Sequence, residues 1–496
     1  MAITKVCGIE TEYGIQAIVN GDANPTSASS LLINSYVAEL ERRIGWDFED
    51  ESPGRDARGF AREGAMPPEV ETHLVNTVLT NGARYYVDHA HPEYSTPECA
   101  DPLQLVVHDK AGERILARSM AATKRVLSQG ERIVVYKNNS DGKGNSYGCH
   151  ENYLLDRATP FARIVAQFTP HLVTRQIYTG AGKVGAEGQA AGSGVQFQMS
   201  QRSDFFEEEV GLETTLKRPI INTRDEPHSD PQKYRRLHVI VGDANLCEVA
   251  TFLKVGVTAL VLAMIEDDSM GDRDLTLATP VRAIREISHD LSLEQEVELR
   301  SGARMTAIGL QWELHDLARK YAEDRGLECI GGETVGTMVL DRWEAVLHSL
   351  ETGSSDVERQ VDWVAKRHLI DAYMDRHQIS WDDPRVAVLD LQYHDVRPEK
   401  SLFARVGGER LVSDEDVDRA ISEPPRDTRA YFRGNCLRRF GASIVAANWD
   451  SIVFDTGGDP LRRVPMMEPL RGTASHVDTL FEECDSPAEL LRRLGS

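Results

Sequence analysis

The stretch RYYVDHAHPEYSTPE, at 84–98, makes the strongest structural demand in this chain. Its first half alternates as a strand does, so Arg84, Tyr86 and Asp88 point to one face. Two prolines then interrupt any β ladder and force turns. The pattern predicts chemically active side chains at the end of a strand, above a cleft. A polar sheet edge followed by a turn explains the segment equally well when it is considered alone.

Two carboxylates near the N-terminus suggest a metal site. Glu10 and Glu12 are two residues apart in a strand expected over 3–15, so both side chains project from one face. Such carboxylates repel one another unless a cation lies between them, and hard cations such as Mg²⁺ take oxygen ligands. A solvent-exposed strand face is the alternative for this pair alone. Ligands for two metal ions become available when three further residues in strand or turn contexts are added: Glu93, His150 and His238.

Asp88 and Arg224 are the next candidates for chemistry. A nearby cation would favour the ionised form of Asp88, which could then act as a nucleophile or a base, or as a further metal ligand. Arg224 follows an apolar strand and is flanked by turn formers, a position that suits a guanidinium reaching a phosphate. An ion pair with Asp225 or Glu226 fits the same spacing. The glycine-rich segment 180–185 is no P-loop, because valine follows its lysine, and we expect a flexible turn there.

Charge and cysteine content limit the class of protein. The formal net charge of −23 argues against binding nucleic acid through general electrostatics. Seven scattered cysteines without a CxxC pair indicate a reducing cytoplasm rather than a disulfide scaffold or a zinc site. No apolar run approaches the ~20 residues of a membrane span, and the N-terminus does not resemble a signal peptide. The most apolar segment, 255–265, is predicted to be a buried helix.

Two segments suggest how the chain is divided. The residues WDFEDESPGRDARGF at 46–60, with the sequence that follows to 73, combine charge, glycine and proline with few apolar side chains. This composition predicts a long mobile loop, and loops of such length are commonly functional lids or disordered. Consecutive prolines at 424–425 predict a boundary between a catalytic domain, 1–425, and a small C-terminal domain, 426–496.

Several longer blocks together resemble the Pup ligase/depupylase family, a branch of the carboxylate–amine ligases with a glutamine-synthetase-like core. The blocks run in order along nearly the whole chain: GIETEYG at 8–14, NGARYYVDHAHPEYSTPE at 81–98, GNSYGCHENY at 144–153, TRQIYTGAGKVG at 174–185, RPIINTRDEPH at 218–228, RLHVIVGDAN at 236–245, NWDSIVFD at 448–455 and VPMMEPLRGT at 464–473. The resemblance implies an α+β fold with a curved, largely antiparallel sheet backed by helices and a small C-terminal domain. It also implies that ATP and Mg²⁺ bind on the concave face of that sheet.

The resemblance implies residue roles as well. Asp88 matches the catalytic aspartate, without deciding between nucleophile and base. Nucleotide-contacting positions of the family fall on Arg84, Thr96, Arg224 and Trp449. Its magnesium ligands fall on Glu10, Tyr86, Glu93, His150 and His238, with a contribution from Glu12.

The family has two branches with opposite chemistry. One uses ATP to join the C-terminal glutamate of Pup, a small ubiquitin-like protein of the proteasome pathway, to substrate lysines. The other hydrolyses that isopeptide bond and deamidates the C-terminal glutamine of Pup, with ATP as a cofactor. Three features resemble the hydrolase branch: ANPTSASS at 23–30, the spacing DHAHPEYS at 88–95 and the loop at 46–60. We expect a cytoplasmic hydrolase acting on Pup and pupylated proteins, with a Pup ligase or a catalytically silent Pup-binding protein as alternatives.

Overall fold

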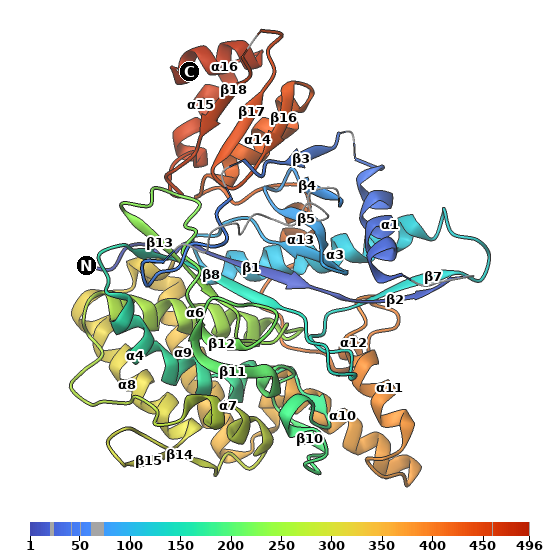
Figure 1. Cartoon of the computed structure of the whole chain (residues 1–496), viewed down its shortest axis with the longest axis vertical. Helices are drawn as coiled ribbons and strands as arrows, with labels where there is room; N and C mark the ends of the chain where they lie inside the picture. The colour runs from blue at the N-terminus through green and yellow to red at the C-terminus, as the bar shows by residue number, and fades with distance from the viewer. Residues whose placement is uncertain (20–23, 41, 50, 61–73, 459, 496) are drawn as a thin grey trace.

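A ten-stranded sheet runs through the middle of the molecule (Figure 1). The computed structural model describes residues 1–19, 24–40, 42–49, 51–60, 74–458 and 460–495. Neighbouring strands in this sheet are antiparallel except for one parallel pair, β3 and β16. In spatial order the strands are β13 (Tyr234–Val239), β8 (Cys149–Asp156), β1 (Cys7–Glu12), β6 (His91–Ser95), β5 (Arg84–Asp88), β4 (Asn76–Val78), β3 (Ile44–Trp46), β16 (Ile444–Ala447), β17 (Ser451–Phe454) and β18 (Arg462–Pro465).

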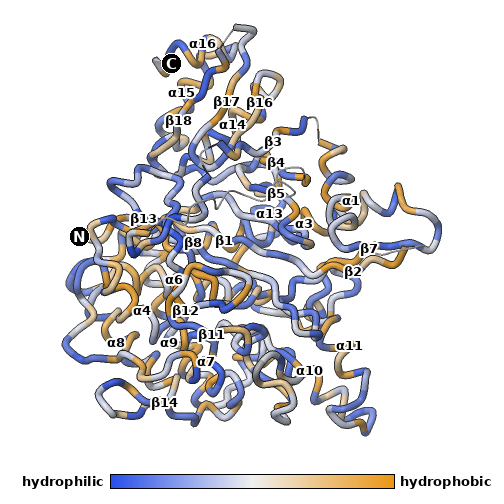
Figure 2. The backbone as a smooth tube through the Cα atoms, viewed as in Figure 1, coloured by the Kyte–Doolittle hydropathy of each residue, from blue (hydrophilic) through white to orange (hydrophobic). Residues whose placement is uncertain are grey.

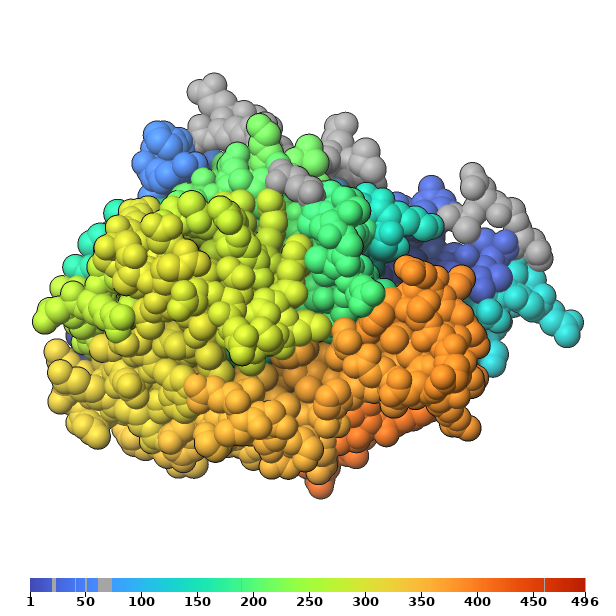
Figure 3. Space-filling view, turned by 90° about the horizontal axis from the view of Figure 1, so that it is seen from below, coloured from blue at the N-terminus to red at the C-terminus, as the bar shows by residue number. Residues whose placement is uncertain are grey.

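Helices cover one face of this sheet. Along β1, Cys7, Ile9 and Thr11 are buried toward them, while the alternate residues face away. The covering helices are α1 (Pro25–Val37), α3 (Pro102–Thr123) and α6 (Glu248–Glu266), with α4 (Phe161–Thr174), α8 (Ala307–Arg325) and α9 (Glu333–Thr352) packed against α6. Seen from below, segments coloured yellow and orange form a continuous layer over this side (Figure 3).

The apolar helix α6 is the centre of the core. Its 18 residues from Glu248 to Ile265 are all buried, and its tube is among the most hydrophobic parts of the chain (Figure 2). Within the described residues it is the one helix long and apolar enough to cross a membrane, but the qualifying window lies wholly inside the protein. The predicted buried helix at 255–265 is therefore confirmed.

Smaller elements complete the chain. Among the described residues, four two-stranded pairs lie outside the main sheet: β2 (Gly14–Ile18) with β7 (Arg132–Tyr136), β9 (Lys183–Val184) with β10 (Phe197–Gln198), β11 (Phe206–Gly211) with β12 (Arg218–Asn222), and β14 (Glu296–Glu298) with β15 (Arg304–Thr306). The other α-helices in the described part of the chain are α5 (Gln176–Thr179), α7 (Pro280–His289), α10 (Asp362–His377), α11 (Pro384–Tyr393), α12 (Phe403–Val406), α13 (Asp414–Ala420), α14 (Ala430–Phe440), α15 (Ala474–Glu483) and α16 (Pro487–Leu494).

The C-terminal residues form a second hydrophobic cluster at one end of the sheet. Phe432, Ile452 and Phe481 pack there, together with Ile44 and Trp46 from the N-terminal part of the chain. Strands β16 to β18 extend the main sheet through the parallel pairing of β16 with β3. The cluster therefore combines the C-terminal segment with β3. The domain boundary at 424–425 stays a prediction.

The segment after Trp46 contacts the middle of the chain where it is described. Trp46 Nε1 donates to Glu51, and the hydroxyl of Thr223 donates to Asp56 at 2.7 Å. The backbone N–H of Ala57 donates to the carbonyl of Thr223 at 2.8 Å. Part of the predicted mobile loop, 61–73, lies outside the described residues.

One prediction about the fold is confirmed and another is wrong. The α+β class, with a largely antiparallel sheet backed by helices, is confirmed. The flexible turn at 180–185 was a wrong prediction for most of that segment, because Gly180, Gly182 and Lys183 are buried. A Cβ atom on Gly180 would lie 2.4 Å from the carbonyl oxygen of Met199, so close backbone packing requires glycine there.

Candidate active site

The sheet face opposite the helices lines a cavity of about 460 Å³. Strand register brings its polar residues side by side: Glu10 lies opposite both His150 and Ser95, and Glu12 lies opposite Glu93. Tyr86 in turn lies opposite Glu93. The side chains around the cavity include Glu10, Phe48, Glu51, Asn76, Arg84, Tyr86, Asp88, Glu93, Ser95, His150, Arg224, Glu226, His228, Arg236, His238 and Trp449.

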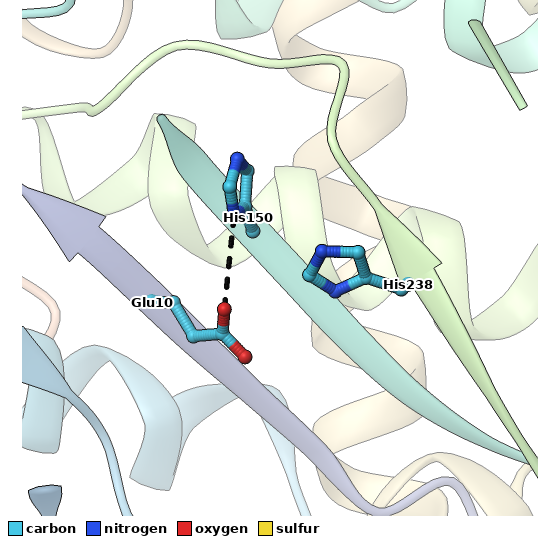
Figure 4. Close-up of side chains that lie close together, drawn as sticks. All are labelled: Glu10, His150 and His238. Carbon is cyan, nitrogen blue, oxygen red and sulfur yellow. Dashed lines mark ion pairs between the residues drawn. The ribbon is translucent and has the colours of Figure 1, made fainter. Parts of the chain in front are cut away.

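Glu10, His150 and His238 form the first candidate cation site. They come from three neighbouring strands and point toward one another (Figure 4), with one ligand atom of each within 4.8 Å of the others. Nδ1 of His150 lies 3.7 Å from Oε2 of Glu10, and the two imidazole rings meet edge to face at 5.0 Å. Burial alone would raise the pKa of Glu10, but its neighbours His150, His238 and Arg236 hold it well below the usual range. Burial lowers the pKa of His238, which leaves a neutral imidazole.

Glu12, Asp88 and Glu93 form a second group, made only of oxygen donors, again within 4.8 Å of one another. Glu93 is 2% exposed. Burial, followed by the negative charges of Asp88, Glu12 and Glu10, raises the pKa of Glu93 well above its ordinary value. Burial also opposes ionisation of Glu12, yet hydrogen bonding and charge from His91, with the charge of His150, lower the pKa of Glu12 to about 2. Excess negative charge concentrated on buried oxygens is the environment that a divalent cation neutralises.

These donors fit hard divalent cations such as Mg²⁺ or Mn²⁺. The second group offers carboxylates alone, and the first adds two imidazoles. Tyr86 lines the same cavity, at the strand position opposite Glu93. All six metal ligands predicted from the sequence therefore lie along one face of the sheet.

Asp88 lies at the end of β5, on the same cavity. Its side chain is 27% exposed, and its Oδ1 is 3.1 Å from Nδ1 of His89. Because Asp88 lines the cavity and is partly exposed, its carboxylate is accessible from solvent. Because Asp88 also belongs to the second oxygen group, the geometry accommodates a nucleophile, a base or a metal ligand.

The four predicted nucleotide contacts line two cavities that share Trp449, the larger one just described and a smaller one of about 80 Å³. The guanidinium of Arg84 lies over the rings of Trp46 and Tyr86, at 4.0 and 3.9 Å. Thr96 lines the smaller cavity, and its hydroxyl accepts a hydrogen bond from the N–H of Ile9 at 3.1 Å.

Arg224 faces the larger cavity. The alternative ion pairs suggested by its spacing are absent among the described residues, because Asp225 pairs with Arg157 and Glu226 lies beside Arg236. Its guanidinium is therefore placed to meet an anionic ligand.

Sequence reasoning missed several residues of the site. Arg236 lies two positions before His238 on β13, so strand periodicity could have placed both on one face. His228 lies between the two cavities, and burial lowers its pKa to about 3. Asn152 and Glu226 gave no signal, because their roles depend on neighbours from other strands.

Comparisons with known proteins show the family of this chain. A family model described as Pup-ligase protein matches residues 5–453. Relatives include "Depupylase" from Acidothermus cellulolyticus, 53% identical, and "Pup deamidase/depupylase" from Mycobacterium tuberculosis, 49% identical, each covering 99% of both chains. A "Pup--protein ligase" from Xylanimonas cellulosilytica is 43% identical over 96% of this chain and 99% of its own.

Solved structures give the same placement. The ligase PafA in complex with Pup superposes with a TM-score of 0.80 at 35% identity, over 97% of this chain and 92% of PafA. PafA in complex with ADP superposes with a TM-score of 0.74 at 38% identity, over 82% of this chain and 89% of PafA. The fold is thus the glutamine-synthetase-like fold of these enzymes. By family match, identity and fold together, this chain belongs to the Pup-ligase protein family.

Proposed function

We propose that this chain is an ATP- and Mg²⁺-dependent hydrolase that deamidates the C-terminal glutamine of Pup and cleaves the isopeptide bond between Pup and substrate lysines. Relatives named for deamidation and depupylation are 48–53% identical over 99% of the chain, and ligase relatives are 39–43% identical. The hydrolase branch therefore has the stronger support.

One observation of this structure carries the proposal. Asp88 belongs to a group of three carboxylates that could hold a cation, and it lines a cavity faced by Arg84 and Arg224. Amide hydrolysis requires a nucleophile or base beside positive charge that stabilises the tetrahedral oxyanion. A protein that only bound Pup would have no use for this arrangement.

The residues divide into three roles in this proposal. Asp88 attacks the side-chain carbonyl or takes a proton from water. Arg84, Thr96, Arg224 and Trp449 bind ATP. The cations are held by Glu10, Glu12, Tyr86, Glu93, His150 and His238, and when bound they supply positive charge to the phosphates and to the reacting carbonyl.

The ligase reaction is the alternative, because solved ligases share this fold. Both reactions need nucleotide, cations and an acidic residue beside the Pup C-terminus. They differ in what happens to ATP, which a ligase consumes once per bond formed and a hydrolase retains. A cytoplasmic location and pupylated proteins as partners belong to the same proposal.

The experiment is a mass measurement on Pup. The chain is incubated with ATP, Mg²⁺ and glutamine-ended Pup, and separately with a Pup–lysine conjugate. We expect deamidated Pup in the first reaction and free Pup in the second, with ATP largely intact. Conjugation of glutamate-ended Pup to an added lysine protein, with stoichiometric ADP, would instead assign the ligase reaction. Asp88→Asn is the matched negative control.

A further inference from the structure

Asn152 links two of the candidate cation ligands. It lies on β8, between the strand of Glu10 and the strand of His238. Its Nδ2 donates to Oε1 of Glu10 at 2.7 Å. Its Oδ1 accepts from an Arg236 guanidinium nitrogen at 2.7 Å and lies 3.0 Å from Nδ1 of His238. One carboxamide therefore contacts a carboxylate, a guanidinium and an imidazole.

The neighbours fix the orientation of this carboxamide. A guanidinium can only donate hydrogen bonds and an ionised carboxylate can only accept them. Arg236 is itself held through Nε by the backbone carbonyl of Glu226 at 2.7 Å, which leaves one terminal guanidinium nitrogen to donate to Asn152. The oxygen of Asn152 must then face Arg236, and its NH₂ group must face Glu10.

This orientation decides the state of His238. Because Oδ1 of Asn152 can only accept, His238 must carry its proton on Nδ1. The Nε2 lone pair is then left for another partner. His150, the second histidine of the group, has its Nδ1 3.7 Å from Glu10, too far for such a hydrogen bond to fix it.

We propose that Asn152 is a positioning residue that holds His238 as the Nδ1–H tautomer and Glu10 in place, so that Nε2 and a carboxylate oxygen face one divalent cation. The cation is part of the proposed function, on which this inference rests. Hydrogen-bonding partners of metal ligands orient them in this way, and their loss costs about 10- to 100-fold in metal affinity.

The test uses two measurements on the full chain. In protein labelled with ¹⁵N-histidine and free of metal, two-bond proton–nitrogen correlations report the tautomer of His238, assigned with His238→Gln. We expect Nδ1–H in the wild type, a mixture in Asn152→Leu, and restored Nδ1–H in Asn152→Asp, which keeps the acceptor. Mn²⁺ affinity, measured by electron paramagnetic resonance, should fall about 10- to 100-fold in Asn152→Leu.

Asn76→Leu is the matched control, since Asn76 lines the same cavity but bonds to Arg84 instead. It should leave the His238 tautomer unchanged. A wild-type His238 protonated on Nε2, or an Asn152→Leu protein with the wild-type tautomer and Mn²⁺ affinity, would overturn the proposal. Absence of Mn²⁺ binding in the wild type would instead overturn the proposed cation site, while the metal-free tautomer would still decide the role of Asn152.

Discussion

Replacing Glu98 with glutamine should loosen the C-terminal segment from the catalytic sheet. Glu98 follows β6, and its carboxylate binds two arginines of the C-terminal segment, Arg429 at 2.7 Å and Arg433. Arg433 also donates to the carbonyl of Trp449 at 3.0 Å, and its guanidinium lies 5.1 Å from the Trp449 ring. The carboxylate thus positions Trp449, which lines both cavities of the candidate site, through a buried ion cluster.

The loss of stability expected for Glu98→Gln follows from the burial of the ion cluster. Arg433 is fully buried, so neutralising Glu98 leaves a charge that water cannot reach. Removing one partner of a buried ion pair costs about 3–5 kcal/mol. The pKa gives a similar figure, because the arginines outweigh the effect of burial and lower the pKa of Glu98 from 4.5 to about 2, which corresponds to about 3 kcal/mol.

The pH dependence has a definite sign. Between pH 2 and 4.5 the unfolded chain binds more protons at Glu98 than the folded chain does. Stability from this group is therefore complete above pH ~4.5 and is lost as the pH falls toward 2. Glu98→Gln should remove this contribution to acid sensitivity.

The assay combines hydrogen exchange, thermal unfolding and nucleotide affinity. We expect faster exchange in α14 and β16 to β18. If about 1–2 kcal/mol of the lost stabilisation also weakens nucleotide binding, the nucleotide affinity should fall about 5- to 30-fold. Glu266→Gln is the matched control, because it breaks the buried ion pair with Lys5 away from both cavities. Equal nucleotide affinity and exchange in the two variants would refute the reasoning.

Three further predictions concern the cavity. Glu10→Ala removes a ligand of the first cation group, so turnover should be lost. Titration calorimetry should show a large fall in nucleotide affinity when Mg²⁺ is present and a much smaller fall when a chelator removes it. Undiminished activity would contradict the proposed cation role. Asp88→Asn should lower turnover at least ~10²-fold while ATP binding survives, and a parallel collapse of nucleotide affinity would make Asp88 a metal ligand. Deletion of 49–58 removes the contacts of Glu51 with Trp46 and of Asp56 with Thr223. The rate of deamidation and its dependence on ATP should therefore change, while Pup binding persists. Unchanged kinetics would mean that the segment only connects its two ends.

Much of the site could be predicted because it follows strand periodicity. Glu10 with Glu12, and Tyr86 with Asp88, are pairs two residues apart, so each shares a sheet face. The strand register that brings these pairs together could not be derived from the local sequence pattern. The register that places Glu12 opposite Glu93 depends on long-range hydrogen bonding between β1 and β6. The buried state of Gly180 likewise depends on Met199 from another segment.

The cavity also explains why a hydrolase would keep ATP as a cofactor. Six carboxylates line it, Glu10, Glu51, Asp88, Glu93, Glu213 and Glu226, against the arginines Arg84, Arg224 and Arg236. A triphosphate adds negative charge to a site that is already acidic, so it requires cations; cations bound by the carboxylates in turn attract phosphates. By linkage, each must raise the affinity of the other by the same factor. In the proposed reaction, a retained nucleotide would therefore strengthen cation binding by the carboxylates around Asp88, and those cations would supply positive charge for amide cleavage.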